Sequence, residues 1–162
     1  MKLFLKRDLS ASDTEFVFFD ESGNEKYLSK HKKTKVTSKL NIIIYDATGS
    51  KVARIRQLPI VATSTFVLKV NKSHMTFVVV PTTKGIYSYF YGKNWHINGD
   101  IAAKNFTVID VDKSVVFSHR QKSRYCELEF SDAANELYCA ATSICANLIN
   151  TVGKSAVKAV NI

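Results

Sequence analysis

Lysines dominate one short stretch of the sequence, residues 26–39, which reads KYLSKHKKTKVTSK. The stretch contains six lysines and one histidine, and it contains no acidic residue. Lysines near an anionic bilayer contribute roughly 1 kcal/mol each before salt screens them, so this stretch could dock reversibly on anions. The alternative is a solvated loop that only keeps the protein soluble. The candidate anion-binding or lipid-binding residues are Lys30, His31, Lys32, Lys33, Lys35 and Lys39.

Two further segments carry charge or aromatic rings. Arg120, Lys122 and Arg124 form a second basic cluster, and the sequence does not show whether it shares a face with the first. Residues 86–95, IYSYFYGKNW, place aromatic rings beside a lysine, as proteins that stack nucleic-acid bases do. Packing inside a sheet explains the same rings. Lysine also outnumbers arginine, which makes the better forked contacts with bases and phosphates, so nucleic acid is not the expected partner.

No pattern in the sequence predicts catalysis or metal binding. The histidines are scattered, without the HxH or HExxH spacing that places two ligands on one metal. Neither a GxSxG motif nor a glycine-rich phosphate loop is present. His119 follows the alternation of Val115 and Phe117, which favours a buried structural histidine. We therefore expect a protein that is not an enzyme and that needs no metal or cofactor.

The sequence predicts that a β-sheet positions these residues. The chain has 162 residues, 46% hydrophobic and 23% charged, which fits one folded domain, and its net charge of +9 favours anionic partners. Short alternating or β-branched runs recur between turn residues, the pattern of a sandwich or a barrel. The expected strands are 2–6, 15–20, 25–29, 40–46, 51–57, 64–71, 74–80, 86–91, 94–98, 105–110, 114–121 and 124–130.

One long apolar helix is expected over residues 132–150, with Ser131 or Asp132 as its N-cap. The helix is apolar nearly all round, so it belongs in a protein core or in a membrane. Its length of roughly 28 Å is marginal for a bilayer. A barrel of about twelve strands is wide enough to hold more than side chains, so we expect this helix to fill it. Residues 151–162 are expected to form a short tail.

An internal repeat points to hairpins built alike. IYDATGSKVARIRQ (44–57) aligns without gaps on VIDVDKSVVFSHRQ (108–121), and FFDESGNEKY (18–27) is a looser copy. Each copy reads as strand, Asp-led turn and strand, in which the aspartate caps its own turn. A cation site is disfavoured because the aspartates belong to separate turns.

Cysteine content and the first residues bear on the compartment. Cys126, Cys139 and Cys145 are an odd number without metal-ligand spacing, which favours buried thiols in a reducing compartment. The N-terminal apolar run is too short for a signal peptide. We therefore expect a cytoplasmic protein.

Three segments together resemble a known family. They are WHINGDI (95–101), NFTVIDVDKSVVFSHRQ (105–121) and YCELEFSDAANELYCAA (125–141). They are similar to the LURP-one-related proteins, including the bacterial YxjI-like group, in the tubby C-terminal-like superfamily that also holds the phospholipid scramblases. The resemblance implies a closed twelve-stranded barrel around a central hydrophobic helix. Tubby proteins bind phosphoinositide through basic residues on the outer surface of the barrel, but none of those residues can be carried over here, and the YxjI-like group implies no settled activity.

These observations combine into one expectation. The fold is mainly β, a single-domain closed antiparallel barrel over residues 1–150 around a C-terminal helix. The function is a non-catalytic intracellular binding module, peripheral at the membrane, which docks on anionic phospholipid, phosphoinositide or an acidic protein. One alternative is a scramblase-like membrane protein whose C-terminal helix inserts in the bilayer, although no integral span is expected. The other is a nucleic-acid-binding protein.

Overall fold

Twelve antiparallel strands form one continuous sheet in this computed structural model, which describes residues 1–8, 14–33 and 40–160. All twelve expected strands are present, because each alternating run ends at a turn residue that sequence alone reveals. The strands are β1 Lys2–Arg7, β2 Thr14–Phe19, β3 Glu25–His31, β4 Leu40–Asp46, β5 Lys51–Leu58, β6 Ser64–Val70, β7 Ser73–Thr82, β8 Gly85–Tyr91, β9 His96–Asp100, β10 Asn105–Ile109, β11 Val115–Gln121 and β12 Cys126–Phe130.

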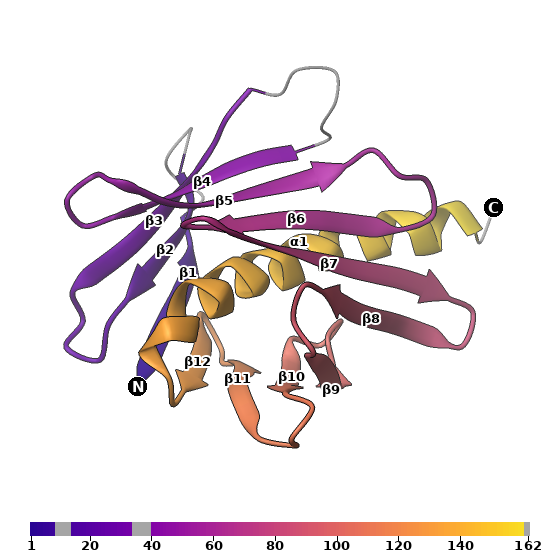
Figure 1. The fold of residues 1–162 in the computed structure, drawn as a ribbon. Helices are drawn as coiled ribbons and strands as arrows, with labels where there is room; N and C mark the ends of the chain where they lie inside the picture. Colours follow the sequence, from indigo (N-terminus) through magenta and orange to yellow (C-terminus); the bar gives the residue numbers. More distant parts are fainter. Residues whose placement is uncertain (9–13, 34–39, 161–162) are drawn as a thin grey trace.

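The sheet curls into a nearly closed barrel (Figure 1). Its strand order is β8-β7-β6-β5-β4-β3-β2-β1-β12-β11-β10-β9. The first strand along the chain, β1, therefore pairs with the last, β12. β8 and β9 stand at the two ends of this order, and no ladder joins them in the described part of the chain, although they lie next to each other. The expected fold class, a mainly β single-domain barrel, is confirmed.

A single long helix occupies the inside of the barrel (Figure 1). A short 3₁₀ turn, η1 (Ala133–Asn135), leads into α1 (Glu136–Val160), and the Asp132 carboxylate accepts a hydrogen bond from the Ala134 N–H at 2.9 Å. The helix residues Cys139, Ile144 and Cys145 are fully buried against the inner faces of the strands. The expectation that this helix forms the core of the barrel is confirmed. No helix in the described residues combines the length and hydrophobicity needed to cross a membrane.

The helix extends beyond its expected end at residue 150 and runs to Val160. The added segment, TVGKSAVKAV, contains alanine and lysine, which are good helix formers, and it has no proline to stop the helix. A glycine inside a helix costs only about 1 kcal/mol relative to alanine, so Gly153 does not end it.

Alternation along the strands decides what faces the core. In β6, Phe66, Leu68 and Val70 are buried and Lys69 is exposed, as the period-two pattern predicts. A chain of aromatic contacts lies on the side of the barrel where no backbone ladder joins β8 to β9 in the described part of the chain. Its ring pairs, with centroid distances, are Phe66–Phe77 at 6.4 Å, Phe77–Phe90 at 4.7 Å, Phe90–Trp95 at 6.0 Å and Trp95–Tyr138 at 5.9 Å. These rings tie β8 to the helix without a backbone ladder.

The Asp-led turns form as the repeat predicts. In the second copy the Asp46 carboxylate accepts hydrogen bonds from the N–H groups of Thr48 at 2.9 Å and Ser50 at 3.0 Å. The first copy uses Asp20 in the same way. The third copy differs, because its Ser114 N–H donates to Asp112 and not to Asp110, the aspartate that leads the turn.

The fourth position of each turn adopts a left-handed backbone, and this leads to a testable difference. Gly49 has φ +84°, and a methyl group added there would meet nothing within 4 Å. Lys113 occupies the equivalent position with φ +68°. We expect Gly49→Ala to lower the free energy of unfolding by about 1–2 kcal/mol through backbone strain alone. Lys113→Gly should leave stability unchanged or raise it by up to about 1 kcal/mol, because strain relief opposes the greater unfolded-state entropy of glycine.

Urea unfolding of the two variants beside the wild type measures this difference. A loss of stability in Lys113→Gly as large as that in Gly49→Ala would contradict a strain-based explanation, since the two changes alter the strain in opposite directions.

Candidate anion-binding site

Basic side chains gather on the outer side of the sheet between β3 and β6. Directly paired residues of an antiparallel sheet share a face. Lys30 of β3 pairs with Ile43 of β4, which pairs with Arg54 of β5. Arg54 in turn pairs with Lys69 of β6. Arg56 lies two residues after Arg54 on the same side, and Lys32 directly follows β3. We call the following set the cationic face: Lys30, Lys32, Arg54, Arg56 and Lys69.

The cationic face has no acidic partner among the described residues. The only carboxylates of β3–β6 are Glu25 and Asp46, which occupy strand ends. Two ion pairs occur in the described part of the chain, and neither includes a residue of the cationic face. The Arg54 guanidinium instead donates to the Asn41 side-chain oxygen at 2.9 Å. A surface of like charges without carboxylates raises the local concentration of anions.

The ring of Tyr45 orders two of these lysines. The ammonium nitrogens of Lys30 and Lys32 lie 5.6 and 5.8 Å from the centroid of that ring. The Lys32 N–H also donates to the Asn41 carbonyl at 2.8 Å, which extends the contact between β3 and β4 by one residue. These contacts hold both lysines on the outer side of the sheet.

The other candidates from the lysine run, residues 26–39, are His31, Lys33, Lys35 and Lys39. His31 pairs with Ile42, whose side chain is buried inside the barrel, so His31 is not part of the cationic face. Lys33 is exposed just after β3. Lys35 and Lys39 lie outside the described residues. The run therefore contributes Lys30 and Lys32 to the cationic face.

Lys26, at the start of the same run, holds the fold together. Its ammonium lies 2.7 Å from the Glu136 carboxylate at the start of α1. The Tyr27 hydroxyl donates to the same carboxylate oxygen at 2.5 Å. Burial, together with this hydrogen bond, raises the pKa of Tyr27. This cluster fixes the first turn of the helix to β3, which makes Lys26 a structural residue.

Sequence reasoning missed Arg54, Arg56 and Lys69. One signal was available, because residues two apart in a strand share a face, and this places both arginines together. Their position beside Lys30 depends on the register between strands. The second basic cluster lies elsewhere in the sheet, on β11 and in the turn after it. The Arg120 guanidinium there donates to the carbonyls of Phe106 at 2.8 Å and His119 at 2.9 Å.

A row of tyrosines on β8 shares the outer side of the barrel with the cationic face. Tyr87, Tyr89 and Tyr91 are 58%, 40% and 61% exposed, and we call them the tyrosine row. Register connects the row to the cationic face through β7, because Tyr91 pairs with Thr76. Packing in the barrel wall explains the buried Phe90 and Trp95 of this segment, and the tyrosines point to solvent.

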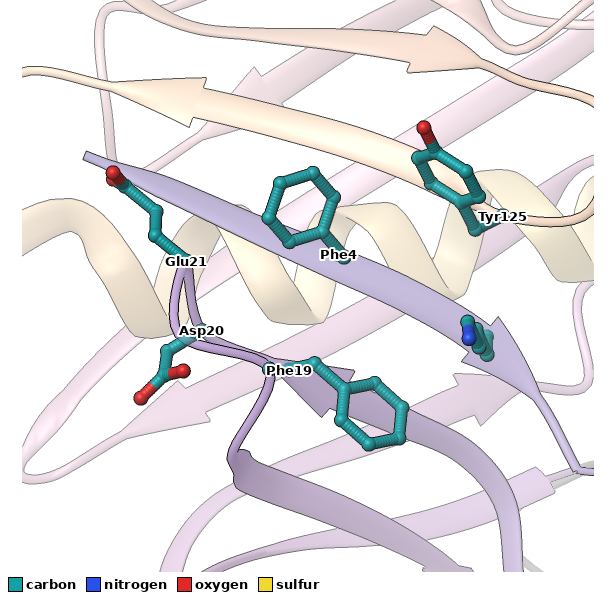
Figure 2. A pocket seen from close by; sticks show the side chains of 7 residues that line it. Phe4, Phe19, Asp20, Glu21 and Tyr125 are labelled. Carbon is teal, nitrogen blue, oxygen red and sulfur yellow. The ribbon is translucent and has the colours of Figure 1, made fainter.

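A shallow groove of about 350 Å³ runs along the outer side of β1 (Figure 2). Phe4 lies between Phe19 and Tyr125, and its ring centroid is 5.8 Å from that of Tyr125. Asp20 and Glu21 lie at one end of the groove. Both carboxylates already accept backbone hydrogen bonds, from Ser22 and Asn24 to Asp20 and from Lys2 to Glu21. The groove therefore offers aromatic surface more than acid–base chemistry.

The buried His119 is satisfied by polar groups inside the barrel, whereas the buried Thr142 hydroxyl has no hydrogen-bond partner among the described residues. His119 is fully buried, its Nδ1 lies 2.8 Å from the Lys104 carbonyl, and its Nε2 lies 2.8 Å from the Ser143 hydroxyl. Burial lowers the pKa of His119 to about 4, so the ring is neutral at physiological pH. The expectation of a buried structural histidine is confirmed. Burial also raises the pKa of Cys139 and Cys145, which disfavours a thiolate nucleophile. No cluster of three potential metal-ligating side chains occurs in the described residues.

The sequence matches a known family, and the fold is similar to that of a solved structure. A family model described as LURP-one-related matches residues 1–134. The X-ray structure of a protein from Arabidopsis thaliana is similar, with a TM-score of 0.59, 12% sequence identity and coverage of 91% of each chain. At that identity the likeness concerns the fold alone. A comparison with curated proteins finds no match.

Proposed function

This chain belongs to the LURP-one-related family, and we propose that it is a non-catalytic binding module that docks on anionic phospholipid at the cytoplasmic surface of a membrane. The cationic face is the observation that carries this proposal. Its residues come from β3 with the residue after it, from β5 and from β6, and they face outward together without a carboxylate among the described residues between them. Such a rigid surface can meet an anionic bilayer with several charges at once.

The tyrosine row favours a lipid surface over an acidic protein. Tyrosine combines an apolar ring with a polar hydroxyl, so it sits well at the boundary between headgroups and acyl chains. Each basic residue near an anionic bilayer contributes roughly 1 kcal/mol, and salt reduces this contribution. The docking is therefore reversible and salt-dependent. The apolar helix takes no part in it, because strands cover its buried residues.

Charge reversal on the cationic face should abolish most of this binding. We expect the double variant Arg54→Glu, Lys69→Glu to bind vesicles containing phosphatidylserine or a phosphoinositide about 10- to 100-fold more weakly than the wild type, because it changes four charge units at the surface. Both side chains are exposed, so the fold should survive. Co-sedimentation with anionic and neutral phosphatidylcholine vesicles, at low and physiological salt, measures the change.

A second double variant, Lys113→Glu, Lys122→Glu, serves as the matched control. It changes the net charge equally, at exposed residues of the β10–β11 and β11–β12 turns. Equal losses in the two variants would mean that only net charge matters, and would overturn the assignment to the cationic face. Binding to an acidic peptide or to single-stranded RNA, with no binding to any vesicle, would overturn the choice of lipid.

A further inference from the structure

A second cationic feature lies where β1, β11 and β12 meet the helix. It is a pocket of about 180 Å³, which we call the mouth pocket. Its polar lining comes from segments far apart in the chain and includes Arg7, Lys104, Gln121, Arg124, Cys126 and Asn147. None of these residues belongs to the cationic face, and Arg7 belongs to β1, two strands away from β3 in the sheet order. The mouth pocket is therefore a separate site.

Three positive charges converge on the mouth pocket without an acidic residue among its described lining. The Arg7 guanidinium lies 5.5 Å from the centroid of the Phe16 ring, which is fully buried. Arg124 is exposed and has no hydrogen bond or ion pair with another described residue. Like charges brought together repel one another, so this arrangement does not by itself stabilise the fold. Clusters that break such a local rule are expected at functional sites.

Lys104 completes the set from a strained position. Its backbone has φ +60°, in the left-handed region that glycine prefers, and its carbonyl lies 2.8 Å from His119 Nδ1. Lys104 and Cys126 both line the pocket. Burial raises the pKa of the Cys126 thiol, and the charge of Lys104 opposes this rise. The turn that precedes β10 therefore places Lys104 in the lining of the pocket.

The remaining polar groups keep the pocket shaped. The Cys126 thiol donates to the Gln121 side-chain oxygen at 3.2 Å. The Asn147 amide nitrogen donates to the Ser143 carbonyl at 2.9 Å, so the helix holds Asn147 in place. The three cations and the hydroxyl-bearing residues Ser123 and Tyr125 complete the polar lining.

We propose that the mouth pocket binds a phosphate group, either inorganic phosphate or the end of a small phosphorylated molecule. The pocket volume of about 180 Å³ leaves room for a ligand of that size. Two arginines beside a lysine suit a compact dianion with several acceptor oxygens, since a guanidinium can donate two parallel hydrogen bonds. This site is independent of the cationic face.

Phosphate titration tests the proposal. Isothermal calorimetry and amide NMR shifts would follow inorganic phosphate added to the full chain, with sodium chloride keeping the ionic strength constant. We expect saturable binding to the wild type. Arg124→Gln and Arg7→Gln should each weaken it about tenfold or more, as the loss of charge-assisted hydrogen bonds implies. Lys84→Gln is the matched control, because it removes one charge from an exposed turn outside the pocket, and it should change affinity less than about twofold.

Two further readouts separate this site from alternatives. Without phosphate and at low salt, Arg124→Gln should melt at the same temperature as the wild type or higher, because it removes repulsion. A lower melting temperature would indicate a structural role and would overturn the proposal. Phosphate binding should persist in Arg54→Glu, Lys69→Glu, so failure of vesicle docking leaves it untouched. Shifts that do not saturate, or affinities that match the control in both arginine variants, would also overturn it.

Discussion

A chain that ends at Ser131 is expected to lose cooperative folding and to aggregate. The truncation removes α1, whose residues from Cys139 to Ala141 and from Ile144 to Ala146 are fully buried inside the barrel. The inner faces of β5, β6, β7 and β12 would then lose the surface they pack on. Each large apolar side chain loses about 1.5–3 kcal/mol when its burial is undone. The summed loss exceeds the roughly 5–15 kcal/mol by which a domain is stable.

Near-ultraviolet circular dichroism, gel filtration and urea unfolding measure this outcome. A chain that ends after Asn150 is the matched control, because it keeps every buried helix residue that the structure describes. We expect this control to unfold in a single cooperative transition. If the chain ending at Ser131 stayed soluble and also unfolded cooperatively, the helix would not be the core of the barrel.

The strands and turns of the fold were predictable because the sequence patterns that indicate them are local. Each strand alternates over a few residues and ends at a turn whose aspartate or glycine is visible in the sequence, as Asp46 and Gly49 show. The position of the helix was predictable from size. A barrel of twelve strands has a wide interior that must be filled, and this chain has one apolar helix to fill it. The incomplete closure between β8 and β9 has no such local signal. On that side the aromatic chain through Phe90 and Trp95 takes the place of a ladder, and it joins residues far apart in the chain.

The candidate surfaces were less predictable because they depend on register. The lysine run indicated Lys30 and Lys32, but Lys69 joins them only through two further ladders, β4–β5 and β5–β6. The same run also holds Lys26, and no local pattern distinguishes this lysine, bound to Glu136, from the exposed ones. The mouth pocket is harder still. Its residues come from separate segments between Arg7 and Asn147, so no spacing along the chain could reveal it.

The buried histidine should make the protein lose stability as the pH falls from about 6.5 to about 4. Burial lowers the pKa of His119 from 6.5 to about 4 in the folded protein, so the unfolded chain takes up a proton first. Its contribution to stability is therefore fully present above pH 6.5 and is lost as the pH falls through this range. At about 1.4 kcal/mol for each unit of pKa, the loss is about 3 kcal/mol. The nearby cations Lys104 and Arg120 act in the same direction as burial.

His119→Gln tests this by removing the titrating group while keeping a polar amide in its place. We expect the variant to be less stable at pH 7, since its amide replaces a ring that stacks on Phe106 with centroids 4.8 Å apart. Its free energy of unfolding should then change by less than about 1 kcal/mol between pH 6.5 and pH 4 on account of this position. Urea unfolding at several pH values compares the two slopes. The other three histidines are exposed in both proteins, so their contribution cancels in the comparison. Equal slopes would mean that the folded barrel admits a proton to His119 as easily as the unfolded chain does, and the hydrogen bonds that join β11 to the helix would then not depend on a neutral ring.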